Sequence, residues 1–128
     1  MKQLYIADDN TGFSEYIATV ASREGWLPVI CVNGQDLVEQ VASGSGSALL
    51  IVDIYMPEMD GIEAIEGLVD VDRQLRLRFI AGGADAPFLA AKMIAEARNL
   101  SVERNIFKPL GKNDLIALLE QEARELGV

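Results

Sequence analysis

The chain has 128 residues, of which half are hydrophobic and about a quarter are charged. This length and composition fit one globular domain and exclude an intrinsically disordered chain. Asp and Glu number 20 against 11 Lys and Arg, so the net charge is −9. This excess of acid excludes general binding to the phosphate backbone of nucleic acids, and we expect no nucleic-acid partner.

The sequence holds no histidine and a single cysteine, Cys31. Catalysis by a Ser-His-Asp or Cys-His arrangement is therefore excluded within the chain, as are zinc sites with histidine ligands. A lone cysteine forms no internal disulfide, which agrees with a reducing compartment. No stretch reaches the roughly 20 apolar residues of a membrane span, and the first residues do not resemble a secretory signal. We expect a cytoplasmic protein without membrane contact.

Strand and helix patterns alternate along the chain. Apolar runs predict buried strands at residues 4–7, 27–32 and 48–53. Residues 76–81 are predicted to form a fourth strand, and residues 102–107 a fifth with a weaker pattern. Apolar residues three and four positions apart predict helices over residues 13–21, 37–41, 62–69, 89–100 and 115–126. Pro28, near the start of the second strand, favours an edge position. The alternation predicts an α/β fold with a five-stranded parallel sheet in the order 2-1-3-4-5, a flavodoxin-like (βα)5 three-layer sandwich.

Acidic side chains follow two strands that this topology makes neighbours. Asp8 and Asp9 come directly after the first strand, and Asp53 ends the third. In doubly wound sheets, ligands bind beyond the carboxyl ends of the strands where the strand order reverses. Taken singly, each acid is more simply a turn or capping residue. Together they would repel one another unless a cation lay among them, and oxygen ligands alone select a hard ion such as Mg²⁺.

A lysine follows the fifth predicted strand. Lys108 precedes Pro109, and on its own it could be a surface residue before a loop. At the carboxyl end of a parallel strand, however, its charge would lie on the same rim of the sheet as the acids. There it could pair with Asp53 or with an oxygen attached to Asp53.

Three segments together resemble the receiver domain of two-component response regulators. They are the Asp8-Asp9 pair, the Asp-x-x-Met-Pro-x-Met-Asp-Gly pattern of residues 53–61, and the Phe-Lys-Pro sequence of residues 107–109. The resemblance covers essentially the whole chain. It implies a single receiver domain over residues 1–128, with no output domain in this chain.

The resemblance also implies a mechanism. Asp53 would accept a phosphoryl group from a histidine kinase or a histidine phosphotransfer protein, and the domain would catalyse only the uptake and loss of that group. The implied ligands of Mg²⁺, or of Mn²⁺ in its place, are Asp8, Asp9, Asp53 and the backbone carbonyl of Tyr55. Metal and Lys108 would offset the charge on the phosphoryl oxygens. The donor histidine would come from the partner, since this chain has none.

Two positions depart from the family pattern. Receivers usually carry Thr or Ser at the end of the fourth strand, where this chain has Ala81, and Tyr or Phe three residues before the lysine, where it has Asn105. Both residues normally couple the phosphoryl group to the helix 4–strand 5–helix 5 surface. That surface would contact a downstream protein or a fused output domain, or form a homodimer. We expect its coupling to the phosphoryl site to be weak or altered.

Three other functions remain to be weighed. The substitutions at Ala81 and Asn105 favour a receiver-like interaction module that works without phosphorylation. A haloacid-dehalogenase-type phosphatase also uses a nucleophilic aspartate, but it needs a second acid two residues later, where this chain has Tyr55. An FMN carrier fits less well, because the first strand–helix turn is acidic where a phosphate would bind.

Overall fold

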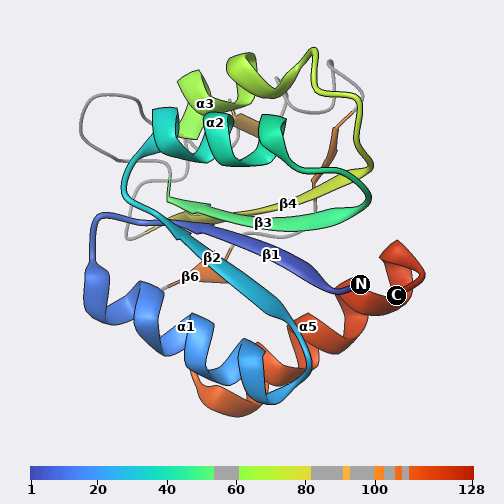
Figure 1. Ribbon diagram of the computed structural model, residues 1–128. Coiled ribbons are helices and arrows are strands. Elements are labelled where there is room, and N and C mark those ends of the chain that lie inside the picture. Colours follow the sequence, from blue (N-terminus) through green and yellow to red (C-terminus); the bar gives the residue numbers. More distant parts are fainter. Residues whose placement is uncertain (54–60, 82–90, 93–99, 103–105, 108–109) are drawn as a thin grey trace.

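A computed structural model describes residues 1–53, 61–81, 91–92, 100–102, 106–107 and 110–128. Strands and helices alternate through these residues (Figure 1). They are β1 (Gln3–Ala7), α1 (Thr11–Arg23), β2 (Leu27–Cys31), α2 (Gly34–Ser43), β3 (Ala48–Asp53), α3 (Gly61–Leu68), β4 (Leu75–Ala81), β5 (Ser101–Val102), β6 (Ile106–Phe107) and α5 (Lys112–Leu126). Of the predicted fourth helix, Ala91 and Lys92 are helical; most of the remainder lies outside the described residues.

The strands form one parallel sheet in the order β2-β1-β3-β4-β5, and β6 also pairs with β4. The predicted fifth strand thus corresponds to two short strands, β5 and β6, both beside β4. Helices α2 and α3 cover one face of the sheet, and α1 and α5 cover the other (Figure 1). The predicted three-layer architecture and strand order are confirmed.

Two hydrophobic clusters fill the space between the three layers, because successive strand residues point to opposite faces of the sheet. In β3, Leu50 and Val52 belong to the cluster beneath α2 and α3. Leu49 and Ile51 belong to the cluster against α1 and α5. All six residues of β3 are buried, which explains why the strand appears in the sequence as a continuous apolar run.

Asparagine side chains fix the starts of the first two helices. The Oδ1 atom of Asn10 accepts a hydrogen bond from the Phe13 amide at 3.1 Å, which caps α1. Asn33 caps α2 in the same way and accepts from the Asp36 amide at 2.8 Å, a role that asparagine commonly takes. These caps set where each helix begins after its strand, and the cap of α1 follows directly on the acidic pair.

The edge strand β2 exposes apolar side chains but offers few free backbone donors. Leu27 and Ile30 are 55% and 40% exposed, and Val32, directly after the strand, is 68% exposed. The Leu27 amide donates to the Lys2 carbonyl at 2.7 Å, so the alternate residues 28, 30 and 32 direct their backbone groups away from β1. At those positions Pro28 has no N–H, and the Val32 amide donates to Asp36 Oδ2 at 3.1 Å. This edge is therefore poorly suited to pair with another strand.

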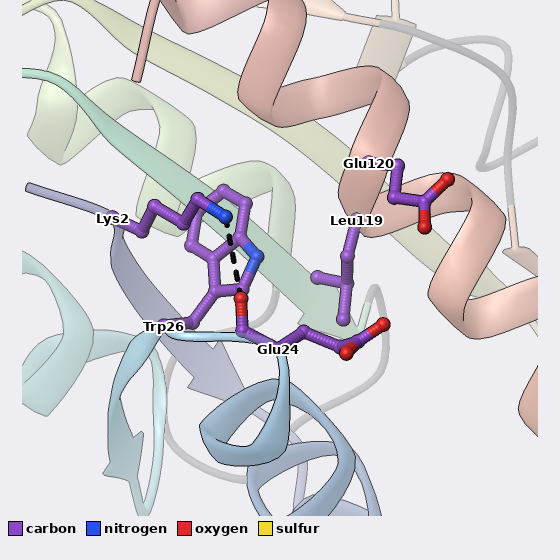
Figure 2. A pocket seen from close by; sticks show the side chains of 5 residues that line it. All are labelled: Lys2, Glu24, Trp26, Leu119 and Glu120. Atoms are coloured by element: carbon purple, nitrogen blue, oxygen red, sulfur yellow. Dashed lines mark hydrogen bonds between the residues drawn. The ribbon is translucent and has the colours of Figure 1, made fainter.

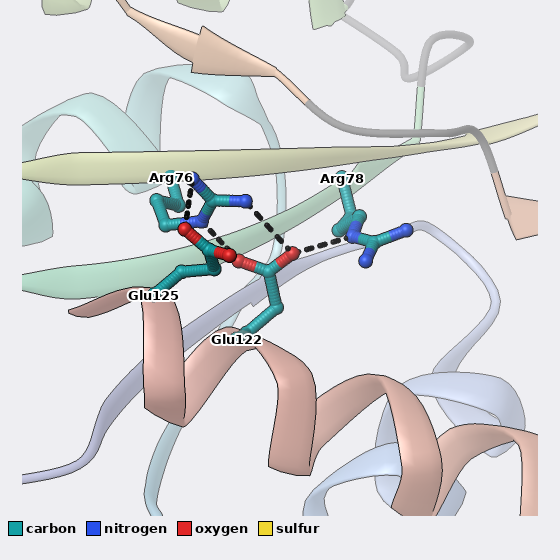
Figure 3. Close-up of polar contacts among 4 residues, drawn as sticks. All are labelled: Arg76, Arg78, Glu122 and Glu125. Atoms are coloured by element: carbon teal, nitrogen blue, oxygen red, sulfur yellow. Dashed lines mark hydrogen bonds and ion pairs between the residues drawn. The ribbon is translucent and has the colours of Figure 1, made fainter. Parts of the chain in front are cut away.

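A buried ion cluster joins β4 to α5 (Figure 3). Arg76 and Arg78 lie on the face of β4 that α5 covers, and both hydrogen-bond to the carboxylate of Glu122. The Arg78 Nε–Glu122 Oε1 distance is 2.8 Å, and the Glu122 side chain is 1% exposed. Glu125, 54% exposed, lies 3.9 Å from Arg76. The cluster fixes α5 against the sheet through charged as well as apolar contacts.

Among the described residues, no helix combines the length and the apolar composition that crossing a membrane requires.

Candidate functional site

The three predicted acids meet at the carboxyl ends of the two central strands. Asp8 follows β1 and Asp53 ends β3, and these strands pair with Ala7 opposite Val52. One carboxylate oxygen from each of Asp8, Asp9 and Asp53 lies within 4.8 Å of the others. The fold therefore places three acids from two separate segments around one point.

Burial differs among these acids. Asp8 is 2% exposed and Asp53 is 7% exposed, whereas Asp9 is exposed. Collecting three carboxylates with two of them buried costs free energy unless positive charge offsets the repulsion. Such an arrangement suits a site that receives a cation at its solvent-facing side.

The turn after β1 and the first turns of α1 hold Asp8 in place. Its Oδ1 atom accepts a hydrogen bond from the Asn10 amide at 2.8 Å. Its carbonyl oxygen accepts a hydrogen bond from the Ser14 hydroxyl at 3.3 Å, and Ser14 is fully buried. Neither support was predicted from the sequence. The donor to Asp8 is the backbone amide of Asn10, which any residue except proline could supply, and Ser14 lies on the apolar stripe of α1 with no signal of its own.

The donor set fits a small divalent cation. Mg²⁺ takes oxygen ligands at about 2.1 Å in octahedral geometry, so two ligands on opposite sides of the ion lie about 4.2 Å apart. The 4.8 Å limit on the carboxylate oxygens exceeds this spacing by about 0.6 Å. Asp8, Asp9 and Asp53 could hold such an ion with small shifts, and water would complete its shell. Mn²⁺ prefers the same oxygen ligands.

The remaining predicted site residues lie at the same edge or outside the described residues. Ala81 ends β4 opposite Phe107, and the preceding residue, Ile80, pairs with Asp53. The position usually held by Thr or Ser is therefore on the strand next to Asp53. Tyr55, Asn105 and Lys108 lie outside the described residues.

A separate pocket lies at the opposite end of the sheet (Figure 2). It has a volume of about 170 Å³ and is lined by Lys2, Glu24, Trp26, Leu119 and Glu120. Lys2 and Trp26 precede β1 and β2, whereas the acids follow β1 and end β3. The Lys2 ammonium donates to the Glu24 carbonyl at 3.2 Å across this pocket. The pocket shares no residue with the acidic site and adds nothing to its chemistry.

The response regulator receiver domain family matches residues 4–120 of the chain. Among curated proteins, the chain is similar to the response regulator receiver protein CpdR of Brucella abortus, with 27% identity over 94% of this chain and 96% of that protein. It is also similar to the chemotaxis protein CheY of Treponema pallidum, with 28% identity over 89% of this chain and 77% of that protein.

Solved structures agree on the fold. A CheY-like response regulator receiver domain protein from Methanospirillum hungatei superposes with a TM-score of 0.82, covering 99% of this chain and 97% of that one at 20% identity. The family match spans nearly the whole length of the chain. The strand order of this chain and the placement of its helices are those that the resemblance to receiver domains led us to expect. The chain belongs to the response regulator receiver domain family.

Proposed function

We propose that this receiver domain accepts a phosphoryl group on Asp53 from a histidine kinase or a histidine phosphotransfer protein. One observation carries the proposal: carboxylate oxygens of Asp8, Asp9 and Asp53 gather within 4.8 Å at the end of the central strands. The absence of histidine from the chain supports a donor on another protein. The family match supports a signalling domain over a free-standing enzyme.

The proposed reaction needs only one nucleophile from this chain. A carboxylate oxygen of Asp53 attacks the phosphorus of the donor phosphohistidine, forming an O–P bond as the N–P bond breaks. The electron pair of the broken bond returns to the imidazole nitrogen of the partner. Mg²⁺ or Mn²⁺, held by Asp8, Asp9, Asp53 and the Tyr55 carbonyl, would offset charge on the phosphoryl oxygens. Lys108 would add a second positive charge, since it follows β6 beside the end of β4.

The output of the domain is proposed to pass through the helix 4–strand 5–helix 5 surface to a downstream protein, a fused output domain or a second copy. We further propose that residues 1–128 act as one receiver domain in the cytoplasm. In support, β1 and α5, at opposite ends of the chain, contribute Leu4 and Leu119 to one hydrophobic cluster. The single buried cysteine also suits a reducing compartment.

A second candidate is an interaction module whose output does not depend on phosphorylation. Ala81 favours it, because this residue ends the strand beside Asp53 and has no hydroxyl to bond a phosphoryl oxygen. Such a hydrogen bond contributes on the order of 1 kcal/mol, and somewhat more to a charged acceptor. Asn105 favours it as well, since it replaces the aromatic residue of typical members.

Phosphorylation with a small phosphodonor tests the proposal. Wild type, Asp53→Asn and Asp72→Asn, a control at an exposed acid, are incubated with the donor and Mg²⁺ and examined by intact-mass spectrometry. We expect wild type and the control to gain the mass of one phosphoryl group, and Asp53→Asn to gain none. Chelation of the metal should abolish the gain. Equal labelling of Asp53→Asn, or no labelling of folded wild type, would contradict the proposal.

The labelling of a further variant and the amide chemical shifts of the phosphorylated protein separate the two candidates. Ala81→Thr restores the hydroxyl, so its labelling should be faster or more persistent than that of wild type. Amide chemical shifts of the phosphorylated protein report the coupling. Large shifts through residues 86–98 and 102–107 would show that the signal reaches the helix 4–strand 5 region despite Ala81 and Asn105. Shifts confined to the acidic site would favour the phosphorylation-independent module.

A further inference from the structure

The pocket at the end of the sheet opposite the acids has the features of a ligand site. It has a volume of about 170 Å³ and lies between the turn that joins α1 to β2 and helix α5 (Figure 2). The turn contributes Glu24 and Trp26, α5 contributes Leu119 and Glu120, and Lys2 comes from the residues before β1. We propose that this pocket binds a free α-amino acid with a small apolar side chain.

Trp26 places a hydrogen-bond donor in the pocket. The residue is 3% exposed, and the nitrogen edge of its indole ring faces the pocket (Figure 2). Among the side chains of the five lining residues, the only hydrogen bond joins the Lys2 ammonium to the Glu24 carbonyl, at 3.2 Å. None of them accepts from the indole N–H, whereas a buried tryptophan usually finds a partner for this group. An oxygen atom of a ligand would supply that partner.

Lys2 adds further donors to the same pocket. An ammonium group has three N–H donors, and the Glu24 carbonyl accepts one of those of Lys2. A carboxylate has two oxygens, so it could accept from the Lys2 ammonium with one and from the Trp26 N–H with the other. Hydrogen bonds between charged groups are stronger than those between neutral groups. The donors of the pocket therefore select a ligand with a carboxylate.

The acids of the pocket select against a simple anion. Glu24 is partly buried, Glu120 is exposed, and both line the pocket. A ligand with a carboxylate alone would be repelled by these two acids, and a ligand with an amine alone would be repelled by Lys2. An amino acid carries both charges, so its carboxylate can meet Lys2 while its ammonium meets Glu24 and Glu120. The mixed charge of the lining thus favours a zwitterion.

The apolar part of the lining limits the size of the ligand. Leu119 is fully buried, and the ring of Trp26 forms the other apolar wall. An apolar cavity of about 150 Å³ holds a molecule of the size of benzene, so a pocket of about 170 Å³ has room for an isopropyl group. Valine is therefore the ligand with which we expect the site to be tested best.

Backbone contacts hold the lining residues in place. The Trp26 amide donates to the Ala21 carbonyl at 3.0 Å, and the Leu27 amide donates to the Lys2 carbonyl at 2.7 Å. Gly25, directly before Trp26, has a φ of 86°, in the left-handed region that favours glycine. This turn brings the indole ring into the hydrophobic cluster on the α1 and α5 face. A site that is already ordered avoids part of the entropy cost of binding.

The single tryptophan allows a direct test, because the indole N–H of Trp26 gives one resonance in ¹H–¹⁵N correlation spectra. The protein is titrated with L-valine, with isovalerate, which lacks the amino group, and with isobutylamine, which lacks the carboxylate. We expect valine to shift the indole N–H resonance downfield in a saturable way, with a dissociation constant in about the millimolar range. Each analogue should bind at least about tenfold more weakly. No saturable shift with valine up to about 50 mM, or equal affinity for valine and either analogue, would overturn the inference.

Substitutions that each remove one charge show which residues hold the ligand. Lys2→Gln should weaken valine binding about tenfold, and Glu120→Gln, at a more exposed position, roughly two- to fivefold. Lys112→Gln and Glu66→Gln are the matched controls, since they remove the same charges at exposed positions outside the pocket and should leave the affinity unchanged. Equal affinities of Lys2→Gln and Lys112→Gln would overturn the assignment of the carboxylate to Lys2. The proposed phosphoryl transfer stands in either case, because no lining residue belongs to the acidic site.

Discussion

Glu122 is the carboxylate on which the stability of the β4–α5 contact depends, and Glu122→Gln tests this directly. The substitution keeps the shape of the side chain and removes its charge. Glu122 is 1% exposed, and the two arginine side chains that bind it, Arg76 and Arg78, are 12% and 7% exposed. Removing one partner from a buried ion cluster typically costs about 3–5 kcal/mol, because the remaining charges stay out of water without it.

This loss is large relative to the stability of a domain, which is typically about 5–15 kcal/mol. For a chain of this length, each kcal/mol shifts the melting temperature by about 4 °C, so Glu122→Gln should melt about 12–20 °C below wild type. Urea unfolding measures the free energy. Trp26, the single tryptophan, is 3% exposed, so its fluorescence should report the transition.

Glu125→Gln is the matched control for this experiment. Glu125 is 54% exposed and lies 3.9 Å from Arg76, and exposed pairs of this kind contribute little. A second control replaces Arg76, Arg78 and Glu122 together by apolar residues of similar size. That variant should regain much of the stability lost in Glu122→Gln, because the buried charges of the cluster are removed together. Equal stabilities of Glu122→Gln and Glu125→Gln would refute the reasoning.

Three further predictions concern other parts of the molecule. Ser14→Ala should weaken Mg²⁺ binding several-fold in calorimetric titrations, since it removes the hydrogen bond beneath the acidic cluster. Burial, and secondarily the charge of Asp36, raises the pKa of Cys31 from 9.0 to about 12. The neutral thiol thus favours the folded state below pH 9, and this contribution is lost as the pH rises toward 12. Between pH 9 and 12, the free energy of unfolding measured with urea should therefore fall less steeply with pH in Cys31→Ala than in wild type. Pro28→Val combined with Asp36→Ala unblocks the β2 edge and should increase self-association in sedimentation measurements, whereas an unchanged sedimentation coefficient would show that the edge is protected by other means.

The sequence was sufficient to predict the architecture because burial on both faces leaves continuous apolar runs. Residues 48–52 predict a central strand, and β3 lies between β1 and β4 with every residue buried. Pro28 predicts an edge, and β2 is the edge strand next to β1. Once the strand order is known, the convergence of Asp8 with Asp53 follows, since parallel strands end at the same rim of the sheet.

The ion cluster could not be predicted by the same means. Glu122 occupies a core position of an amphipathic helix, where hydrophobic periodicity counts an acid as a polar residue and assigns it to the surface. Its burial depends on which side chains of β4 it meets, and the sequence of α5 holds no information about them. Arg76 and Arg78 alternate with Leu75, Leu77 and Phe79 along β4, so only the pairing of that face with α5 brings the charges together.

The hydrogen bond from the Tyr16 hydroxyl to the Leu110 carbonyl could not be predicted either, for a related reason. The spacing of Tyr16 with Phe13 and Ile17 marks the inner stripe of a helix, and this role is satisfied by its ring alone. The hydroxyl gains its partner only because the sheet returns the chain to α1 after 94 residues, at the carbonyl of Leu110. Local patterns determine which side chains face the core, whereas contacts between a side chain and a distant backbone depend on the closed fold. Local sequence patterns therefore predict the acids that define the site, whereas the groups that position these acids can be identified only from the closed fold.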